Sequence, residues 1–182
     1  MEKAPQSDKK LIEQIAVGNP EALGQFALRY QDTALSLAYR NTQNWTDAED
    51  IVQEAFIRVF KSAKSYKGQS GIKTWLYRII VNLCIDHQRK NKSSISLDTT
   101  TTDLFSQSSP DHLEAQETAA LVQKAVYELP ERQRIALILH RYENLSHSEI
   151  SESTGWSRST IESLLVRAYE KLRKKLEKVE FH

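Results

Sequence analysis

Four carboxylates within residues 47–54 are the first side chains whose types and spacing suggest chemistry: Asp47, Glu49, Asp50 and Glu54. Acidic side chains on adjacent turns of a helix could hold a divalent metal ion, as a nuclease or phosphodiesterase does. Such a site also needs ligands from a second element, and usually a histidine, and neither is evident nearby. The remaining interpretations are a solvated acidic face and, more specifically, a docking surface for a basic partner.

Basic and aromatic residues are combined in the next stretch, KGQSGIKTWLYRIIVNLCIDHQRKNK, residues 67–92. An expected helix there would carry side chains suited to phosphates and base edges: Lys73, Tyr77, Arg78, Asn82, Gln88, Arg89, Lys90 and Lys92. Aromatic rings beside basic groups can also stack on single-stranded bases. Trp75 lies on the apolar stripe and is expected in the core, whereas Tyr77 lies off the stripe and is the expected stacking residue.

Residues 145–176, LSHSEISESTGWSRSTIESLLVRAYEKLRKKL, have the pattern of a helix-turn-helix motif, with Gly155 at the turn. Apolar residues keep to one side of the second helix. The other side faces solvent or DNA and offers Arg158, Ser159, Glu162, Ser163, Val166, Arg167 and Lys171. An ordinary helical hairpin is the alternative, because periodicity alone does not separate the two. The basic run 173–175 is weaker evidence, since such runs also complement a helix dipole.

Helices must position all of these residues, because apolar residues recur at three- and four-residue steps through most of the chain. The expected N-terminal domain, residues 1–92, contains four helices with a shared core. The predicted helix starts are Ser7, Asn19 followed by Pro20, Thr46 with Glu49 three residues later, and Ile72 after a turn at 68–71.

The stretch 93–112, SSISLDTTTTDLFSQSSPDH, is polar and acidic and lacks periodicity, which predicts a flexible linker. The expected second domain, residues 113–182, begins with a helix capped by Asp111 with Glu114. Pro130 starts the next helix, and the helix-turn-helix motif follows with Ser146 as N-cap. The predicted fold is therefore all-α, with two small helical domains joined by a linker.

The formal charge of +1 divides unevenly along the chain: −3 over 1–60, +7 over 61–92, −6 over 93–131 and +3 over 132–182. Two separate basic surfaces could therefore meet phosphate. The single cysteine, Cys84, excludes an internal disulfide, and five scattered histidines predict no metal and no cofactor. The sequence offers no apolar run for a signal peptide or a membrane span, so we expect a cytoplasmic protein.

At these residues the sequence resembles a known family. DAEDIVQEAFIRVF and GIKTWLYRIIVNLCIDHQRK are similar to region two of extracytoplasmic-function (ECF) sigma factors of the sigma-70 family. LPERQRIALILHRYENLSHSEISESTG and STIESLLVRAYEKLRKKL are similar to region four. Both regions occur in this order with only a polar linker between them, and no region three is recognisable, which indicates the ECF group.

The resemblance implies roles for residues already singled out. The acidic helix would dock on the clamp helices of the largest polymerase subunit through Asp47, Asp50, Gln53 and Glu54. The loop 67–72 would capture a base flipped from the non-template strand of the minus-ten element, and Asn82 would read the upstream edge of that element. The full set expected to meet minus-ten DNA is Lys67, Gly68, Gln69, Ser70, Lys73, Tyr77, Arg78, Asn82 and Arg89.

The second domain would read the minus-thirty-five element as duplex, with Ser163, Val166 and Arg167 at the bases and Arg158 and Ser159 near phosphate. Glu162 and Leu164 depart from the family, because many relatives have basic residues at these positions. A phosphate would repel Glu162, although its carboxylate could accept a hydrogen bond from a cytosine amino group.

The resemblance thus implies a sigma factor that directs core RNA polymerase to promoters and melts them, and that an anti-sigma protein holds inactive. A polymerase-independent helix-turn-helix regulator is the alternative function. A metal-dependent phosphodiesterase that uses the acidic helix is the alternative in which the chain is an enzyme.

Overall fold

The computed structural model describes residues 7–94 and 110–177, and every regular element within them is helical. The elements are α1 (Asp8–Ala16), α2 (Pro20–Thr42), α3 (Trp45–Ser62), the 3-10 helix η1 (Ala63–Ser65), α4 (Ile72–Ser94), α5 (Pro110–Tyr127), α6 (Glu131–Arg141), α7 (His147–Thr154) and α8 (Arg158–Leu176). The all-α prediction is confirmed. None of the described helices is long and apolar enough to cross a bilayer.

Helices α1–α4 form the N-terminal unit, and local side-chain caps set where its helices begin. Ser7 Oγ accepts from Lys10 N (3.4 Å), and Asn19 Oδ1 accepts from Glu21 N (2.9 Å) ahead of Pro20, as predicted. The predicted cap at Thr46 is wrong. Gln43 adopts a left-handed conformation (φ 55) that ends α2, so the chain turns two residues earlier and Asn44 Oδ1 accepts from Asp47 N (3.1 Å).

The core of the N-terminal unit comes from the apolar stripes of its four helices. Leu11, Phe26, Leu37, Leu76 and Ile80 are completely buried. Each such side chain contributes about 1.5–3 kcal/mol relative to an exposed one. This core fixes α3 and α4 against each other, and these helices carry the acidic and basic residues singled out above.

Helices α5–α8 form the C-terminal unit. Helix α5 begins at Pro110, so the end of the stretch expected as linker is already helical, and Asp111 lies inside the first turn rather than at the N-cap. Most of the expected linker lies outside the described residues. The starts predicted at Pro130 and Ser146 are confirmed, since α6 follows Pro130 and Ser146 caps α7; Ser157 caps α8.

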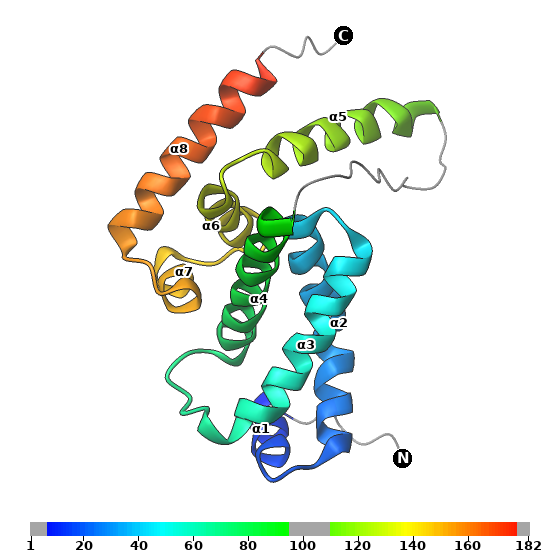
Figure 1. The fold of residues 1–182 in the computed structure, drawn as a ribbon, viewed down its shortest axis with the longest axis vertical. Coiled ribbons are helices and arrows are strands. Elements are labelled where there is room, and N and C mark those ends of the chain that lie inside the picture. The colour runs from blue at the N-terminus through cyan, green and yellow to red at the C-terminus, as the bar shows by residue number, and fades with distance from the viewer. Residues whose placement is uncertain (1–6, 95–109, 178–182) are drawn as a thin grey trace.

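The two units pack against each other, with α4 between the rest of the N-terminal unit and helices α6 and α7 (Figure 1). The most extensive contact is between α4 and α7, where the completely buried Ser153 has Oγ 3.4 Å from Thr74 O. Helix α2 also meets the C-terminal unit, since Gln123 Nε2 donates to Gln43 Oε1 (2.8 Å).

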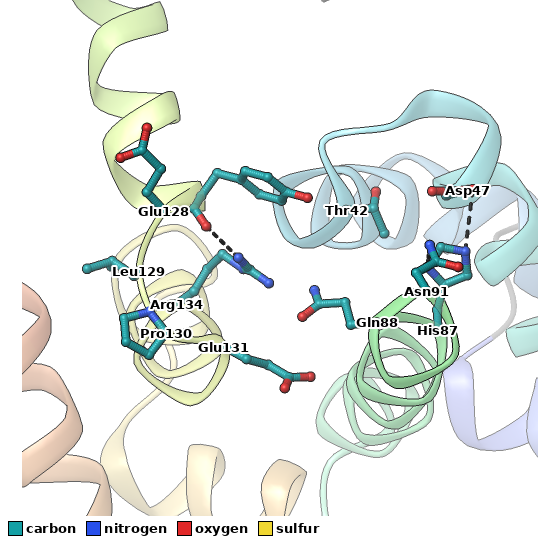
Figure 2. A pocket seen from close by; sticks show the side chains of 11 residues that line it. Thr42, Asp47, His87, Gln88, Asn91, Glu128, Leu129, Pro130, Glu131 and Arg134 are labelled. Atoms are coloured by element: carbon teal, nitrogen blue, oxygen red, sulfur yellow. Dashed lines mark hydrogen bonds and ion pairs between the residues drawn. The ribbon is translucent and has the colours of Figure 1, made fainter. Parts of the chain in front are cut away.

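A cleft of about 440 Å³ opens farther along the same boundary (Figure 2). Its walls come from both units: Thr42, Asp47, His87, Gln88 and Asn91 on one side, and residues 127–131 with Arg134 on the other. Most of the residues along these walls have polar side chains. The boundary between the units is therefore tight at α4 and α7 and open beside the C-terminal end of α4.

Candidate docking and nucleic-acid surfaces

The acidic surface of α3 is built by Asp50, Gln53 and Glu54, whose spacing places them on one side of the helix. Asp50 and Gln53 are exposed, and Glu54 Oε1 accepts from Arg58 Nε (3.0 Å). Asp47 is not part of this exposed surface. It is half-buried, with Oδ1 3.4 Å from His87 Nε2 on α4, and it lines the cleft rather than the open face (Figure 2).

Two apolar side chains extend the acidic surface by a further turn or two. Ile57 and Phe60 are 46% and 39% exposed. The apolar periodicity of α3 assigns Phe60 to the core, and that assignment is wrong, because Val59 takes the buried position of this turn. The three- and four-residue steps from Gln53 to Ile57 and Phe60 are the signal that could have revealed this apolar extension.

Three of the four carboxylates of α3 contact side chains of this chain. Asp47 meets His87, Glu49 accepts from Trp45 Nε1 (3.0 Å), and Glu54 pairs with Arg58. Within the part of the chain that the structure describes, no three His, Cys, Asp or Glu side chains converge on a possible metal site.

The loop between η1 and α4 is fixed by an aromatic residue that sequence reasoning did not single out. The Tyr66 hydroxyl donates to Ser70 O, and its ring lies 4.8 Å from the ring of Trp75. Burial raises the pKa of Tyr66, so this hydroxyl stays protonated and remains a donor. Gly68 adopts a left-handed conformation (φ 68) that favours glycine. Trp75 packs against the core, as expected, and the loop residues Lys67, Gly68 and Gln69 are exposed.

Helix α4 carries four exposed residues of the nine expected to meet minus-ten DNA. Lys73, Arg78, Asn82 and Arg89 are all exposed, and Arg89 Nη2 lies 3.2 Å from Asp86 Oδ1. Arg78, Asn82 and Arg89 follow one another at four- and seven-residue steps and share one exposed side of α4, whereas the Lys73 ammonium lies 5.2 Å from the centre of the Tyr77 ring. We call this set, with the loop residues 67–70, the α4 surface.

The structure corrects the expectation for Tyr77. Its side chain is completely buried, and its hydroxyl donates to the carboxylate of Glu143 in the C-terminal unit. Burial, reinforced by this hydrogen bond, raises the pKa of Tyr77. Tyr77 lies off the core stripe, as predicted, but α7 covers the face on which it lies. In this arrangement it has no access to a base.

The helix-turn-helix motif is held by short-range contacts. Ser146 Oγ accepts from Glu149 N (3.3 Å) while the Glu149 carboxylate accepts from Ser146 N (2.8 Å), which is a complete capping box. Gly155 turns the chain with φ 75, and Ser151 Oγ donates to Trp156 O (2.6 Å). These contacts fix the angle at which α8 leaves α7.

Every residue predicted for the outer side of α8 is exposed: Arg158, Ser159, Glu162, Ser163, Val166, Arg167 and Lys171. Arg158 Nη2 donates to Ser148 Oγ (2.9 Å), and Glu162 Oε1 lies 3.7 Å from His147 Nδ1. Val166 is 57% exposed, so its side chain lies on the open side of α8 among the polar residues. We call this side of α8 the α8 surface.

The capping box leads to a stability prediction. Ser146→Ala is expected to lower the free energy of unfolding by about 1 kcal/mol, because the orphan amides of α7 lose their acceptor. The hydroxyl and backbone N–H of Ser146 lower the pKa of Glu149, so this stabilisation is present above the ordinary Glu value of 4.5 and is lost as the pH falls. Urea unfolding of the variant and the natural chain at about pH 7 and about pH 3.5 should show the difference shrinking in acid.

Ser36→Ala is the matched control, because Ser36 is exposed in the interior of α2. It should show neither the loss of stability nor the pH dependence. A Ser146→Ala penalty of equal size at both pH values would contradict the role given to Glu149.

Comparison with known proteins agrees with this geometry. The family model for Sigma-70 region 2 matches residues 26–94, and the model for Sigma-70 region 4 matches residues 119–172. The ECF RNA polymerase sigma factor SigW of Bacillus subtilis is 34% identical over 179 residues, which cover 92% of this chain and 96% of SigW.

Two solved structures share the fold. CnrH, in complex with the cytosolic domain of CnrY, has a TM-score of 0.70 at 25% identity, covering 95% of this chain and 99% of CnrH. The sigma factor RpoE of Bartonella quintana, in complex with the anti-sigma factor NepR, has a TM-score of 0.70 at 24% identity, covering 86% of this chain and 97% of RpoE. The fold, the two matched regions and the full-length similarity together show that this chain belongs to the ECF group of RNA polymerase sigma factors.

Proposed function

We propose that this sigma factor docks on core RNA polymerase through α3, holds the opened minus-ten element on the α4 surface, and reads the duplex minus-thirty-five element with the α8 surface. The chain acts without a catalytic residue of its own, in the cytoplasm, where the polymerase works. The single observation that carries the proposal is the separation of an acidic, partly apolar face on α3 from two exposed polar and basic faces on other helices.

The α3 face suits a protein partner. Asp50, Gln53 and Glu54 provide negative charge and hydrogen-bonding groups, and the exposed Ile57 and Phe60 provide apolar area beside them. Protein interfaces commonly combine an apolar centre with a charged rim. A basic surface on the polymerase would meet the carboxylates and guide the encounter, and the apolar side chains would supply burial.

The α4 surface suits a melted strand. Lys73, Arg78 and Arg89 can neutralise phosphates, and Asn82 can both donate to and accept from a base edge. Unpairing one base costs a few kcal/mol, and capture of that base by stacking and hydrogen bonds offsets the cost without ATP. The loop that Tyr66 and Trp75 hold in place supplies the exposed groups for such a capture.

The α8 surface suits duplex DNA. Arg158 and Ser159 lie at the N-terminal end of the helix, where phosphates are favoured, and Ser163 and Arg167 lie one and two turns further along. Glu162 is the exception, because its carboxylate would accept from a cytosine amino group rather than contact phosphate. Its exposure leaves it accessible for that role.

An anti-sigma protein is the further partner that we propose. RpoE of Bartonella quintana, which has the same fold, was solved with the anti-sigma factor NepR bound. A partner of that class would compete with polymerase or DNA for the surfaces described above.

Run-off transcription with purified core polymerase on genomic fragments tests the proposal. We expect discrete transcripts only when this chain is added to core enzyme. A gel-shift assay with the chain alone separates the alternative function, because a polymerase-independent regulator would bind duplex operator tightly without core. Absence of any association with core polymerase at low ionic strength would overturn the proposal.

A further inference from the structure

One wall of the cleft between the two units carries a buried arginine, Arg134 on α6 (Figure 2). Only 6% of this residue is exposed. Its Nη1 donates to Tyr127 O (2.5 Å), and its guanidinium carbon lies 4.8 Å from the centre of the Tyr127 ring. Its Nε has no hydrogen-bond partner among the described residues. The carbonyl and the ring fix the guanidinium in place, but neither carries a full negative charge that would neutralise it.

Burial lowers the pKa of Arg134, because a charged guanidinium loses the solvation that water would give it. A buried charge of this kind is normally paired with an opposite charge, since removal from water costs several kcal/mol per ion. The position of Arg134 in the wall of a cleft therefore favours an anionic group of a ligand as its partner.

Glu131 lies one turn before Arg134 on the same side of α6 and lines the same cleft. It is half-buried, and its Oε1 is buried without a hydrogen-bond partner among the described residues. Both side chains project toward α4 across the cleft (Figure 2). The wall formed by α6 therefore offers a ligand one positive and one negative group, side by side.

The other carboxylates that line the cleft already have basic partners. Asp47 Oδ1 lies 3.4 Å from His87 Nε2, and Glu128 pairs with Lys175 on α8. A ligand therefore meets its charged partners mainly on α6. A ligand that is only anionic is repelled by Glu131, and one that is only cationic is repelled by Arg134. A ligand that carries both charges is attracted by both residues.

The spacing on α6 suits the charged groups of an α-amino acid. Residues three positions apart on a helix have Cβ atoms about 5–6 Å apart. The ammonium and the carboxylate of an α-amino acid are attached to one carbon, so they can reach two such neighbours at once. Hydrogen bonds between ionised groups are shorter and stronger than those between neutral groups. Arg134 and Glu131 thus form a plausible pair of partners for one zwitterion.

The opposite wall of the cleft indicates the kind of side chain that the ligand carries. Gln88 projects from α4 toward α6, and its Nε2 donates to Asn41 O (3.0 Å), which holds its carboxamide in place (Figure 2). The cleft has a volume of about 440 Å³. Small-molecule sites commonly have about 300–1,000 Å³ and occur at boundaries between domains. Because most residues along the cleft are polar, a polar side chain finds more partners there than an apolar one.

We propose that the cleft is a binding site for a free α-amino acid with a polar side chain, whose carboxylate meets Arg134 and whose ammonium meets Glu131. The side chain of the ligand lies toward Gln88, so the ligand bridges α6 and α4. This inference goes beyond the proposed function and does not depend on it, because neither Glu131 nor Arg134 belongs to the surfaces assigned to polymerase or DNA.

Titration of the full chain, followed by ligand-observed NMR, tests the site without polymerase or DNA. The probes are L-glutamine, L-asparagine and L-serine, with L-leucine as the apolar comparison. At least one polar probe should bind, and more tightly than leucine. Absence of binding by all three polar probes at millimolar concentration, or equal affinity for leucine, would overturn the proposal.

Analogues of the polar probe that binds best test the two charged contacts on the natural chain. The N-acetyl analogue lacks the ammonium, and the analogue with an amide in place of the α-carboxylate lacks the anionic group. Each is expected to bind about tenfold or more weakly than the parent amino acid, because each loses a hydrogen bond between charged groups. Undiminished affinity of either analogue would refute the contact that it removes.

Glu131→Gln keeps the size of the side chain and removes its charge. We expect it to weaken binding of the amino acid about tenfold and to abolish the discrimination against the N-acetyl analogue, since the ammonium loses its charged partner. Glu128→Gln is the matched control, because Glu128 lines the same cleft but pairs with Lys175, and it should change neither quantity. Discrimination that persists in Glu131→Gln would overturn the role of Glu131. The analogues need no variant, so they decide even if Glu131→Gln fails to fold.

Thermal unfolding gives a second readout of the same site. A ligand that binds only the folded chain raises the unfolding midpoint as its concentration rises. The amino acid should raise the midpoint of the natural chain and of Glu128→Gln but not that of Glu131→Gln. Failure of amino-acid binding leaves run-off transcription intact, whereas failure of the proposed function leaves the NMR titration intact, so the two are distinguishable.

Discussion

Asp50→Lys combined with Glu54→Lys is expected to weaken binding to core RNA polymerase about a hundredfold or more. Asp50 is exposed and Glu54 is half-buried on the same side of α3, so the substitutions place two positive charges on the face proposed to meet a basic surface of the polymerase. Juxtaposition of like charges in an interface costs several kcal/mol, and each 1.4 kcal/mol is a tenfold loss of affinity. Titration of labelled core polymerase with the variant measures the loss directly.

The double variant should fold normally. Asp50 is exposed, so its replacement buries no charge. The Glu54–Arg58 pair on the helix surface contributes no more than about 0.5 kcal/mol to the free energy of unfolding. Glu13→Lys with Asp32→Lys is the matched control, because both residues are exposed on α1 and α2 and the change in net charge is identical. Equal affinities for the double variant and this control would refute docking through α3.

Salt provides an independent check on the same face. Attraction between exposed charges weakens within a Debye length of about 8 Å at physiological ionic strength. The association rate of the natural chain with core polymerase should fall as salt is added, while that of Asp50→Lys with Glu54→Lys should rise or stay level. A salt response of the same sign in both chains would indicate that charge on α3 does not guide the encounter.

Local features of the sequence predicted the fold well where short-range contacts decide it. The Ser146 capping box and the turn at Gly155 involve residues no more than a few positions apart, so their spacing is visible in the sequence. The predicted start of α3 was two residues too late, because short-range contacts allow more than one cap there. Asn44 and Thr46 are both good caps, and the left-handed conformation of Gln43 decides between them.

The long-range contacts were not predictable in this way. The apolar stripe of α4 correctly placed Leu76 and Ile80 in the core, but one stripe describes one buried face. Helix α4 has a second buried face, and the partner of Tyr77 on that face is Glu143, 66 positions away in the chain. No local pattern connects a tyrosine in one unit with a glutamate in the other. An aromatic residue off the stripe beside basic residues therefore suggested DNA, whereas in the free chain it contacts the C-terminal unit.

Among the predicted site residues, exposure was predictable where one helix decides it and was not predictable where two helices pack together. Exposure of the α8 surface follows from helical periodicity, because that helix packs on one side only, and all seven predicted residues are exposed. Asp47 was grouped with Asp50 on spacing alone, yet it meets His87 from α4 because the two helices are packed together. Periodicity assigns a residue to a side of its helix, and the packing of neighbouring helices decides whether that side is free.

Arg78→Ala combined with Asn82→Ala is expected to lower promoter opening about a hundredfold while leaving core binding unchanged. Both side chains are exposed on α4, so their loss removes one phosphate contact and one base-edge contact. Base-edge contacts are worth about 1–3 kcal/mol each, and a lost phosphate contact lowers affinity further at physiological salt. Permanganate reactivity of unpaired thymines in complexes with polymerase measures the open fraction.

A template with a pre-opened minus-ten bubble distinguishes capture of the strand from destabilisation of the duplex. The bubble removes the cost of unpairing, so a defect in unpairing alone would disappear on it, whereas a defect in holding the strand persists. We expect the defect of Arg78→Ala with Asn82→Ala to persist, because both groups are proposed to contact the strand after it opens. Lys9→Ala with Gln31→Ala, exposed on α1 and α2, is the matched control and should open both templates normally. Full recovery on the bubble would assign these residues to the duplex, and α4 would then act before the strands separate rather than after.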